Sequence, residues 1–307
     1  MTEGQTLIVI LHFGTINDTV ECLRSLECFL SSPFDVLVIN NGPDADVEPQ
    51  LRTACPDVIY REAGVETGFA AGNNIGLKLS LAQGYCYTLL LNNDTVAEQD
   101  FLLPLIDILE RIPEVAMAGP AMYHYDNPAH LWSCGGWINR WSGSMAGNRT
   151  MDSSLPPLSD VDYLPGACVL VRNESLGSIG LLSEEYFLGV EEADWACQAR
   201  RLGFRVVASS DSILLHKVGV SSRFTPELIY NSFRNRFLFL RRQFRFPLRL
   251  LLPIALLGRR LFADPAERTL CLRAFWDHCK YESIRREHLE AVKSQYAIAK
   301  QGVTVSG

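Results

Sequence analysis

Residues 88–94 read TLLLNND, an apolar run that becomes polar at its last three positions. Residues 7–14 (LIVILHFG) and 35–42 (DVLVINNG) have the same form, an apolar stretch that ends in polar residues or glycine. Short apolar runs that alternate with helical segments predict a mainly parallel α/β sheet. Because such sheets bind ligands at the carboxyl ends of their strands, the polar endings predict a ligand site at one edge.

Further elements extend this pattern along the chain. We expect helices from near Asp18, with Glu21 as its capping-box partner, and over 73–83, 101–111 and 192–202. We expect additional strands over 58–60, 115–122, 167–172 and 204–209. Residues 123–160 are rich in Gly, Ser, Pro and Trp and predict a long irregular region with a binding role. From Thr225 onward the sequence predicts helices.

Composition narrows the class of protein. The chain has 307 residues, of which 48% are hydrophobic and 21% charged, as in ordinary globular proteins. Its nine cysteines include no Cys-x-x-Cys pair, which argues against a disulfide framework or a zinc ribbon and favours the cytoplasm. The polar start and the short apolar run after it predict a first strand and no secretion signal.

Charge is distributed unevenly. Residues 1–222 carry 28 acidic and 12 basic side chains, whereas residues 223–262 carry nine arginines and one acid. The apolar run at 246–257, interrupted by Arg249 and two prolines, is shorter than the roughly 20 residues that cross a bilayer. Two interpretations stay open: a helix lying on an anionic membrane surface, or a helix that docks onto the core or onto a second copy.

Candidate chemical groups follow several of the strands. Asp94 emerges from an apolar strand, where a carboxylate suits a hard divalent cation bound together with phosphate oxygens. Glu191, Glu192 and Asp194 place three carboxylates at a helix start, and a carboxylate there could deprotonate a sugar hydroxyl. His216 ends a strand-like segment. Each group also has a structural interpretation, as a helix cap, a dipole partner or a satisfied polar residue.

Taken in order, the motifs resemble the family 2 glycosyltransferases, in particular their bacterial rhamnosyltransferase-like branch, over roughly residues 5–240. The segments that carry the resemblance are LIVILHFG (7–14), VINNG (38–42), ETGFAAGNNIGL (66–77), LLLNNDT (89–95), GGWINRWSG (135–143), VDYLPGACVLVR (161–172), EEADWACQARRLGFRVV (191–207) and LLHKVGVSS (214–222). The resemblance implies a GT-A fold: a Rossmann-like, mainly parallel sheet with helices on both faces.

The resemblance also implies roles for particular residues. Asp94 occupies the last position of the family's Asp-x-Asp metal motif, and His216 the position that completes metal binding. Glu192 occupies the catalytic-base position, normally aspartate, with Glu191 and Asp194 as a supporting acidic cluster. The implied nucleotide-sugar-binding residues are Phe13, Asn40, Gly68, Asn73, Asn74, Asn92 and Asn93. Asn40 replaces a common aspartate, and Asn92 replaces the first aspartate of the metal motif.

The implied activity is inverting, cation-dependent sugar transfer, with Mg²⁺ or Mn²⁺ as cofactor and dTDP-rhamnose or a UDP-sugar as donor. The implied acceptor is a cell-surface or lipid-linked saccharide, and no nucleic acid is involved. The expected domains are a catalytic domain over 1–224, with a nucleotide-binding half (1–122) and an acceptor half (123–224), and a helical region over 225–307. We expect a cytoplasmic protein, peripheral on the inner face of the membrane or homodimeric through that region.

Two other classes of protein share features of this sequence. A sugar nucleotidyltransferase would need a glycine-rich loop with a basic residue after the first strand, and residues 11–17 (LHFGTIN) offer neither. A non-catalytic sugar-binding protein on a decayed enzyme scaffold stays open, because Asn92 and Glu192 both depart from the commonest family residues.

Overall fold

The computed structural model describes residues 5–43, 46–64, 67–147, 155–218, 225–260 and 264–280, together with positions 290, 292, 293 and 297. Glu66 and residues 219–222 of the motifs quoted above lie outside the described residues.

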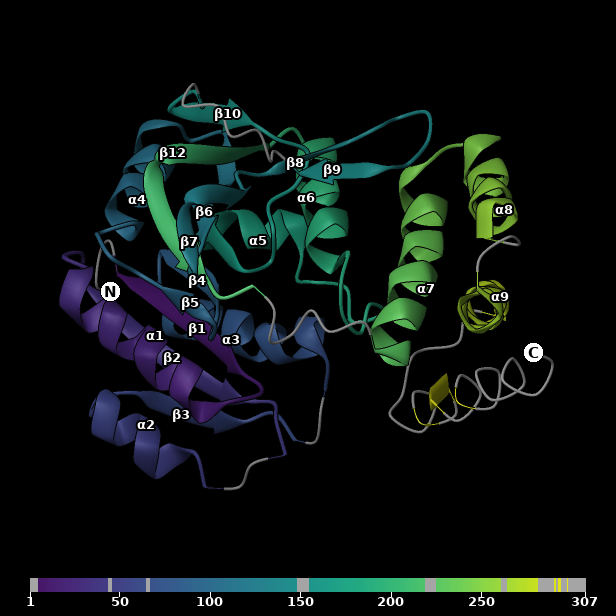
Figure 1. The fold of residues 1–307 in the computed structure, drawn as a ribbon. Coiled ribbons are helices and arrows are strands. Elements are labelled where there is room, and N and C mark those ends of the chain that lie inside the picture. The colour runs from purple at the N-terminus through teal and green to yellow at the C-terminus, as the bar shows by residue number, and fades with distance from the viewer. Residues whose placement is uncertain are drawn as a thin grey trace.

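A mixed sheet forms the centre of the molecule (Figure 1). Its strand order is β10-β12-β6-β11-β4-β1-β2-β3, with β5 paired to β12 and β7 paired to β6. The strands are β1 (Thr6–His12), β2 (Phe34–Asn40), β3 (Ile59–Glu62), β4 (Tyr87–Asn92), β5 (Thr95–Val96), β6 (Val115–His124), β7 (Asn127–Ser133), β10 (Leu158–Asp160), β11 (Cys168–Arg172) and β12 (Arg205–His216).

Most neighbouring strands that end at the predicted ligand edge run parallel to each other. β4, β1, β2 and β3 form one parallel group, and β6 with β12 forms another. β11 runs antiparallel to both β4 and β6 and lies between the two groups. The predicted mainly parallel sheet is therefore confirmed. The parallel arrangement brings the ends of β1, β4 and β12 to the same edge of the sheet.

Helices cover both faces of the sheet, because each face carries apolar side chains. On one face, α1 (Ile16–Phe29), α2 (Glu48–Ala54) and α4 (Leu102–Arg111) share a buried core with Ile8 and Leu89. On the other, α3 (Phe69–Gln83), α5 (Asn173–Ile179) and α6 (Glu191–Arg201) share a core with Leu7 and Leu90. Successive residues of β1 and β4 thus point to opposite cores, as strand geometry requires.

Two local predictions are wrong. α1 begins at Ile16 without a side-chain cap bond, and Glu21 accepts a hydrogen bond from Lys217 at 2.6 Å instead of completing a capping box. The region 123–160 is not irregular throughout. It contains β7, β10 and a separate hairpin of β8 (Gly136–Ile138) and β9 (Met145–Gly147). Their shortness and the mostly exposed pattern of β7 leave no apolar alternation to detect.

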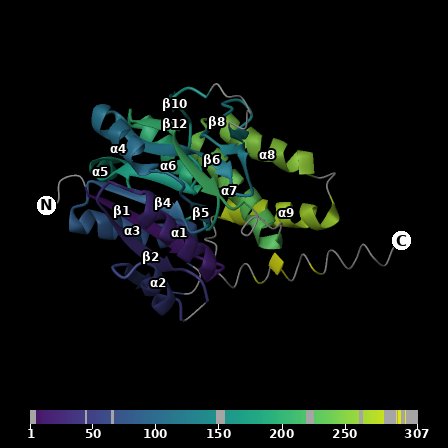
Figure 2. The ribbon, with the colours of Figure 1, turned by 60° about the vertical axis from the view of Figure 1, so that its left-hand side comes forward.

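The C-terminal region is helical as predicted and packs against α6 (Figure 2). It comprises α7 (Pro226–Gln243), α8 (Leu248–Arg260) and α9 (Pro265–Lys280). Thr225 caps α7 by accepting a hydrogen bond from the amide of Leu228 at 3.2 Å. Phe237 and Leu270 belong to a core shared by α7 and α9. Within the described residues, no helix is both long enough and apolar enough to span a membrane.

The arginines of residues 223–262, here called the arginine block, do not all face solvent. Arg234 is only 3% exposed, and Arg242 pairs with carboxylates of the body. Arg245, Arg249 and Arg259 are the exposed members among the described side chains of the block.

Candidate active site

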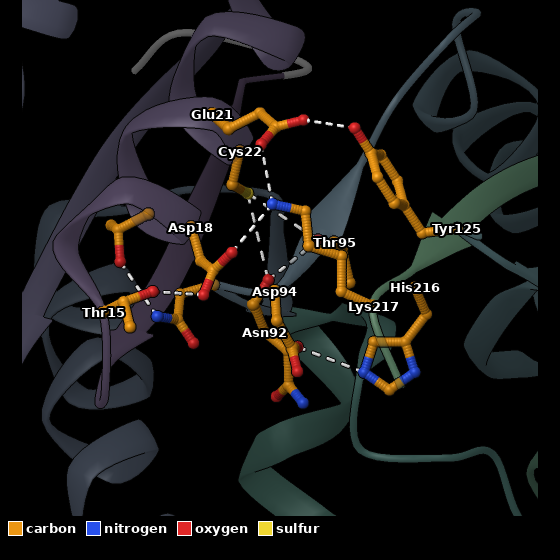
Figure 3. A network of polar contacts seen from close by, with 12 residues as sticks. Thr15, Asp18, Glu21, Cys22, Asn92, Asp94, Thr95, Tyr125, His216 and Lys217 are labelled. Carbon is orange, nitrogen blue, oxygen red and sulfur yellow. Dashed lines mark hydrogen bonds and ion pairs between the residues drawn. The ribbon is translucent and has the colours of Figure 1, made fainter. Parts of the chain in front are cut away.

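A buried acid–imidazole pair lies at the carboxyl edge of the sheet. Asp94 follows β4 in a tight turn, and His216 ends β12; each is 6% exposed. The Nε2 atom of His216 lies 3.1 Å from Oδ1 of Asp94 (Figure 3). The pairing of β5 with β12 places Thr95 opposite His216 and so brings the two side chains together across 122 residues.

Two further features fix this pair in place. The Trp132 ring packs edge-on against the His216 ring, with their centroids 4.4 Å apart. The amide of Lys217 donates to the Asp94 carbonyl at 2.9 Å. The Nδ1 atom of His216 is buried and has no hydrogen-bond partner in the part of the chain that the structure describes. A buried ring nitrogen without a partner is costly, so the site is suited to a ligand that the imidazole can bind.

A polar network missed by the sequence analysis joins the end of β12 to α1. The ammonium of Lys217 donates to Asp18 at 2.8 Å and to Glu21 at 2.6 Å, and the Tyr125 hydroxyl donates to Glu21 at 2.8 Å (Figure 3). The hydrogen bond from Lys217 lowers the pKa of Glu21 below its usual value. The network keeps the His216 end of β12 against the start of α1.

The amide side chains at the ends of β2 and β4 largely shape the edge of the sheet. Asn93 donates to the Phe13 carbonyl at 3.0 Å and to the Thr19 hydroxyl at 2.9 Å. Asn40 is buried and accepts from the Gly42 amide at 3.1 Å. The Phe13 side chain is 53% exposed, and Asn92 is half-buried, so both remain accessible to a ligand at this edge.

A second residue missed by the sequence analysis positions the loop after β3. Oδ1 of Asn41 accepts from both the amide and the hydroxyl of Thr67, at 2.9 and 2.8 Å. Gly68 follows with a φ of +85°, and a side-chain carbon there would lie 2.5 Å from the carbonyl oxygen of Phe187. Glycine is required at position 68 because a side chain would strain the left-handed backbone there and would also collide with the Phe187 carbonyl. The contact brings the loop against the segment that precedes the acidic cluster.

Asn73 and Asn74 lie inside α3, which begins four residues earlier than predicted. Asn74 donates to the Leu182 carbonyl at 2.9 Å and to Glu184 at 2.8 Å, and it accepts from the Leu182 amide at 3.1 Å. Asn73 donates to the Phe69 carbonyl at 3.0 Å. The Asn74 amide thus ties α3 to the segment that leads to the acidic cluster, which is a structural role.

The acidic cluster begins α6, directly after a left-handed turn. Glu191 is 2% exposed and Glu192 is half-buried. Burial raises the pKa of both carboxyl groups well above their usual range, and the charge of Glu192 raises that of Glu191 further. A raised pKa makes a carboxylate a stronger base near neutral pH. One carboxylate oxygen of Glu191 is buried and has no hydrogen-bond partner among the described residues. The charged form of Glu191 is therefore less well stabilised than that of Glu192.

Glu192 lies close to the strand that leads to Asp94. A side-chain carbon at Gly166 would lie 3.9 Å from Cβ of Glu192, and the adjacent Ala167 carbonyl accepts from the Asn92 amide at 2.9 Å. The Gly166–Ala167 turn therefore joins the position of Glu192 to the carboxyl end of β4. Asp194, by contrast, faces α7: Arg242 contacts it at 3.1 Å, and Gln243 donates to its other oxygen.

A pocket of about 430 Å³ adjoins the turn before the cluster. The turn contributes Leu188, Gly189 and Val190, and α7 and α9 contribute the remaining wall. The other lining residues are Leu228, Ile229, Ser232, Phe233 and Glu267. Its predominantly apolar wall suits a hydrocarbon or the apolar face of a sugar.

The Asp94–His216 pair fits a partial cation site. Within the described residues, no group of three or more His, Cys, Asp or Glu side chains converges as a complete metal cage. One carboxylate and one imidazole with an unpartnered nitrogen are nevertheless a reasonable protein share for a cation whose other ligands are phosphate oxygens and water.

The molecule has the GT-A fold, and comparison with known proteins identifies its family. Residues 7–177, more than half of the chain, match the model of glycosyl transferase family 2, and the chain belongs to this family. Several of its relatives are named as hexosyl- or rhamnosyltransferases, as the resemblance implied, and they support the rhamnosyltransferase-like branch.

Two relatives and one solved structure illustrate this similarity. The low-salt glycan biosynthesis hexosyltransferase Agl10 of Haloferax volcanii is 24% identical over 75% of this chain and 74% of its own length. The N-acetylglucosaminyl-diphospho-decaprenol L-rhamnosyltransferase of Mycobacterium tuberculosis is 25% identical over 66% of this chain and 72% of its own. The mannosyltransferase PcManGT of Pyrobaculum calidifontis, solved with GDP-Man and Mn²⁺, shares the fold with a TM-score of 0.54 at 12% identity, covering 98% of this chain and 87% of that one.

Proposed function

We propose that this protein transfers a sugar, with rhamnose as the first candidate, from a nucleotide-diphosphate donor to an acceptor hydroxyl, with inversion at the anomeric carbon. The observation that carries the proposal is the buried Asp94–His216 pair at the sheet edge, with Glu192 beside the strand that ends there. The L-rhamnosyltransferase among the relatives favours rhamnose and hence dTDP-rhamnose, and a UDP-sugar is the second candidate.

Asp94 and His216 would hold a divalent cation, Mg²⁺ or Mn²⁺, together with the donor diphosphate. When bound, the cation would neutralise the negative charge that develops on the departing diphosphate. The Mn²⁺ in the mannosyltransferase complex supports this assignment. With Asn92 in place of an acid, the protein provides one negative charge fewer, so we expect the cation and the donor to bind as a unit.

The chain's own residues would then carry the proton transfer. Glu192 accepts the proton of the acceptor hydroxyl as that oxygen forms a bond to the anomeric carbon. The bond from this carbon to the diphosphate oxygen breaks on the opposite side, which inverts the configuration. Phe13 and Asn40 would contact the nucleoside, and Asn92, Asn93 and the Gly68 motif would line the donor.

The acceptor side is supported by the pocket beside residues 188–190. Its apolar wall fits a saccharide with an apolar component, as in a lipid-linked or cell-surface acceptor. The relative from M. tuberculosis is named for such an acceptor. In this arrangement residues 1–224 would form the catalytic domain, with nucleotide and acceptor halves that meet near residue 122. The region from 225 onward, described as α7, α8 and α9, would lie at the cytoplasmic face of the membrane.

A donor panel tests the proposal. Purified protein is titrated with dTDP-rhamnose, UDP-sugars and GDP-sugars, each with Mg²⁺, with Mn²⁺ and with EDTA, and is scored for heat of binding and donor hydrolysis. We expect one dTDP- or UDP-sugar to bind in a cation-dependent manner and to be hydrolysed slowly. If EDTA leaves the binding of every donor unchanged, the proposed role of the cation is wrong. If no donor binds, a non-catalytic protein on a decayed enzyme scaffold is favoured.

A further inference from the structure

Helix α7 contacts the backbone of the segment that presents the acidic cluster. Asn235, fully buried in α7, donates through its Nδ2 atom to the carbonyls of Leu188 at 2.9 Å and Gly189 at 2.8 Å. Both amide hydrogens of Asn235 are thereby used on two consecutive carbonyls. The next carbonyl, that of Val190, accepts the first helical hydrogen bond of α6, from the Asp194 amide at 3.0 Å.

The backbone held in this way is unusual. Val190 has a φ of 79° and a ψ of −14°, and it is the only non-glycine residue with a positive φ among the described residues. A β-branched side chain in the left-handed region is strained, and such strain persists only where the surroundings impose it. Gly189, with a φ of 88°, completes a double left-handed turn immediately before Glu191 and Glu192.

We propose that Asn235 is a positioning residue for the catalytic base: its two hydrogen bonds impose the Leu188–Val190 turn and so fix where Glu192 points. Asn235 then contributes to catalysis without itself touching either substrate. The inference rests on the proposed function in so far as Glu192 acts as the base.

Asn231 offers a matched control within the same helix. It lies one turn before Asn235, is 2% exposed, and has an Oδ1 atom without a hydrogen-bond partner in the described part of the chain. Replacing either asparagine by leucine removes an amide of the same size at the same depth. Only the change at 235 removes donors to the turn.

The first test does not depend on activity. Hydrogen exchange is measured on peptides that cover residues 185–194 in the wild type, Asn235→Leu and Asn231→Leu. We expect exchange in this segment to be at least about tenfold faster in Asn235→Leu and within about twofold of wild type in Asn231→Leu, because exchange follows local opening. Equal exchange in the two variants would overturn the proposal.

The second test uses the donor and acceptor that the panel identifies. In Asn235→Leu we expect kcat to fall by at least about tenfold while KM for the donor stays within about threefold, since a misplaced base slows the chemical step. Adding Val190→Gly removes the strain and should restore part of kcat. Unchanged kcat in folded Asn235→Leu would contradict the inference, as would a loss equal to that of Asn231→Leu.

If the leucine variants do not fold, Asn235→Ala and Asn231→Ala take their place with the same expected contrast. A wild type without transferase activity would refute the proposed function, and the exchange measurement would still decide whether Asn235 imposes the turn.

Discussion

Glu191 and Glu192 are adjacent in the chain, but their side chains differ in burial and in neighbours. Glu191 is almost fully enclosed and has an oxygen without a partner, whereas Glu192 is half-buried next to the Gly166 turn. A base must reach the acceptor, so the greater exposure of the Glu192 side chain makes it the proposed base. Asp194 is held by Arg242 and Gln243 and supports the helix start instead.

The first prediction concerns the base. Glu192→Gln keeps the size of the side chain but removes its ability to accept a proton, so kcat should fall by about 10²-fold or more. Donor affinity should stay within about twofold, because Gln retains the polar contact. Steady-state kinetics and calorimetry measure the two quantities. A Glu191→Gln variant that loses as much activity as Glu192→Gln would show that the two residues act as one unit.

The second prediction concerns the cation pair. Asp94→Asn and His216→Ala should each weaken donor binding by at least about tenfold in the presence of Mn²⁺ and have little effect in EDTA, because cation and diphosphate bind together. Titration calorimetry under both conditions checks this. His130, an exposed histidine of β7, provides the control: His130→Ala should leave the cation dependence unchanged.

The third prediction concerns stability and pH. Burial raises the pKa of Glu191 in the folded state, so between the ordinary glutamate value and this raised value the folded protein binds more protons than the unfolded one. The stability that this group contributes is therefore present at low pH and is lost as the pH rises through the folded pKa. When the pH is raised from 5 to 8, the Tm of Glu191→Gln should increase by about 2 °C or more relative to the Tm of the wild type. Glu110→Gln, on the exposed face of α4, should show no such gain.

At the scale of elements, Lys217 joins β12 to α1, and the fourth prediction follows from it. Lys217→Met would leave Asp18 and Glu21 without their common cation, which should lower the free energy of unfolding by about 1–3 kcal/mol in urea titrations. Donor binding should weaken as well, because His216 is the preceding residue. Lys78, whose exposed pair with Glu184 spans 3.9 Å, is the control: Lys78→Met should cost at most about 1 kcal/mol. Equal losses in the two variants would contradict a special role for Lys217.

The sequence predicts elements well where local patterns decide them. The apolar runs of β1, β2 and β4 and the glycine that ends α3 at Gly84 appear where the periodicity places them. Local patterns fail where a distant residue decides. Glu21 fits a capping box in sequence, but Lys217, 196 residues away, takes it as a partner.

The candidate site divides in the same way. Strand endings and the family motifs identify Asp94, His216 and Glu192, because each stands at a marked point in its segment. Asn41 lies in such a strand ending, but the pattern does not indicate its partner Thr67, which is 26 residues away. Asn235 lies in no such pattern, and its partners, the Leu188 and Gly189 carbonyls, are about 46 residues distant. A buried asparagine in a helix is the one signal that could have indicated Asn235, because its amide must find partners.

At the scale of the whole molecule, the C-terminal helices face the catalytic body on one side and solvent on the other. Leu252 and Leu256 of α8 pack inward, while Leu250, Leu251 and Ile254 are 55–60% exposed on the same helix. A helix that is apolar on all sides is normally covered. Arg245, Arg249 and Arg259 are exposed on or beside it. Because two copies meeting here would bring these like charges together, an anionic bilayer is the partner that the charge pattern favours.

The last prediction is therefore salt-sensitive binding to anionic vesicles and little binding to neutral ones, measured by co-sedimentation. Each arginine near such a surface contributes about 1 kcal/mol, so replacing Arg245, Arg249 and Arg259 by Gln should lower partitioning by about 10²-fold. Replacing Leu250, Leu251 and Ile254 by Ser should remove the part of the binding that persists in high salt, because apolar insertion is not screened. Leu103→Ser on α4, equally a surface leucine, should change nothing. Indifference of the wild type to vesicles, with a dimeric mass that the serine variant loses, would assign α8 to a second copy instead.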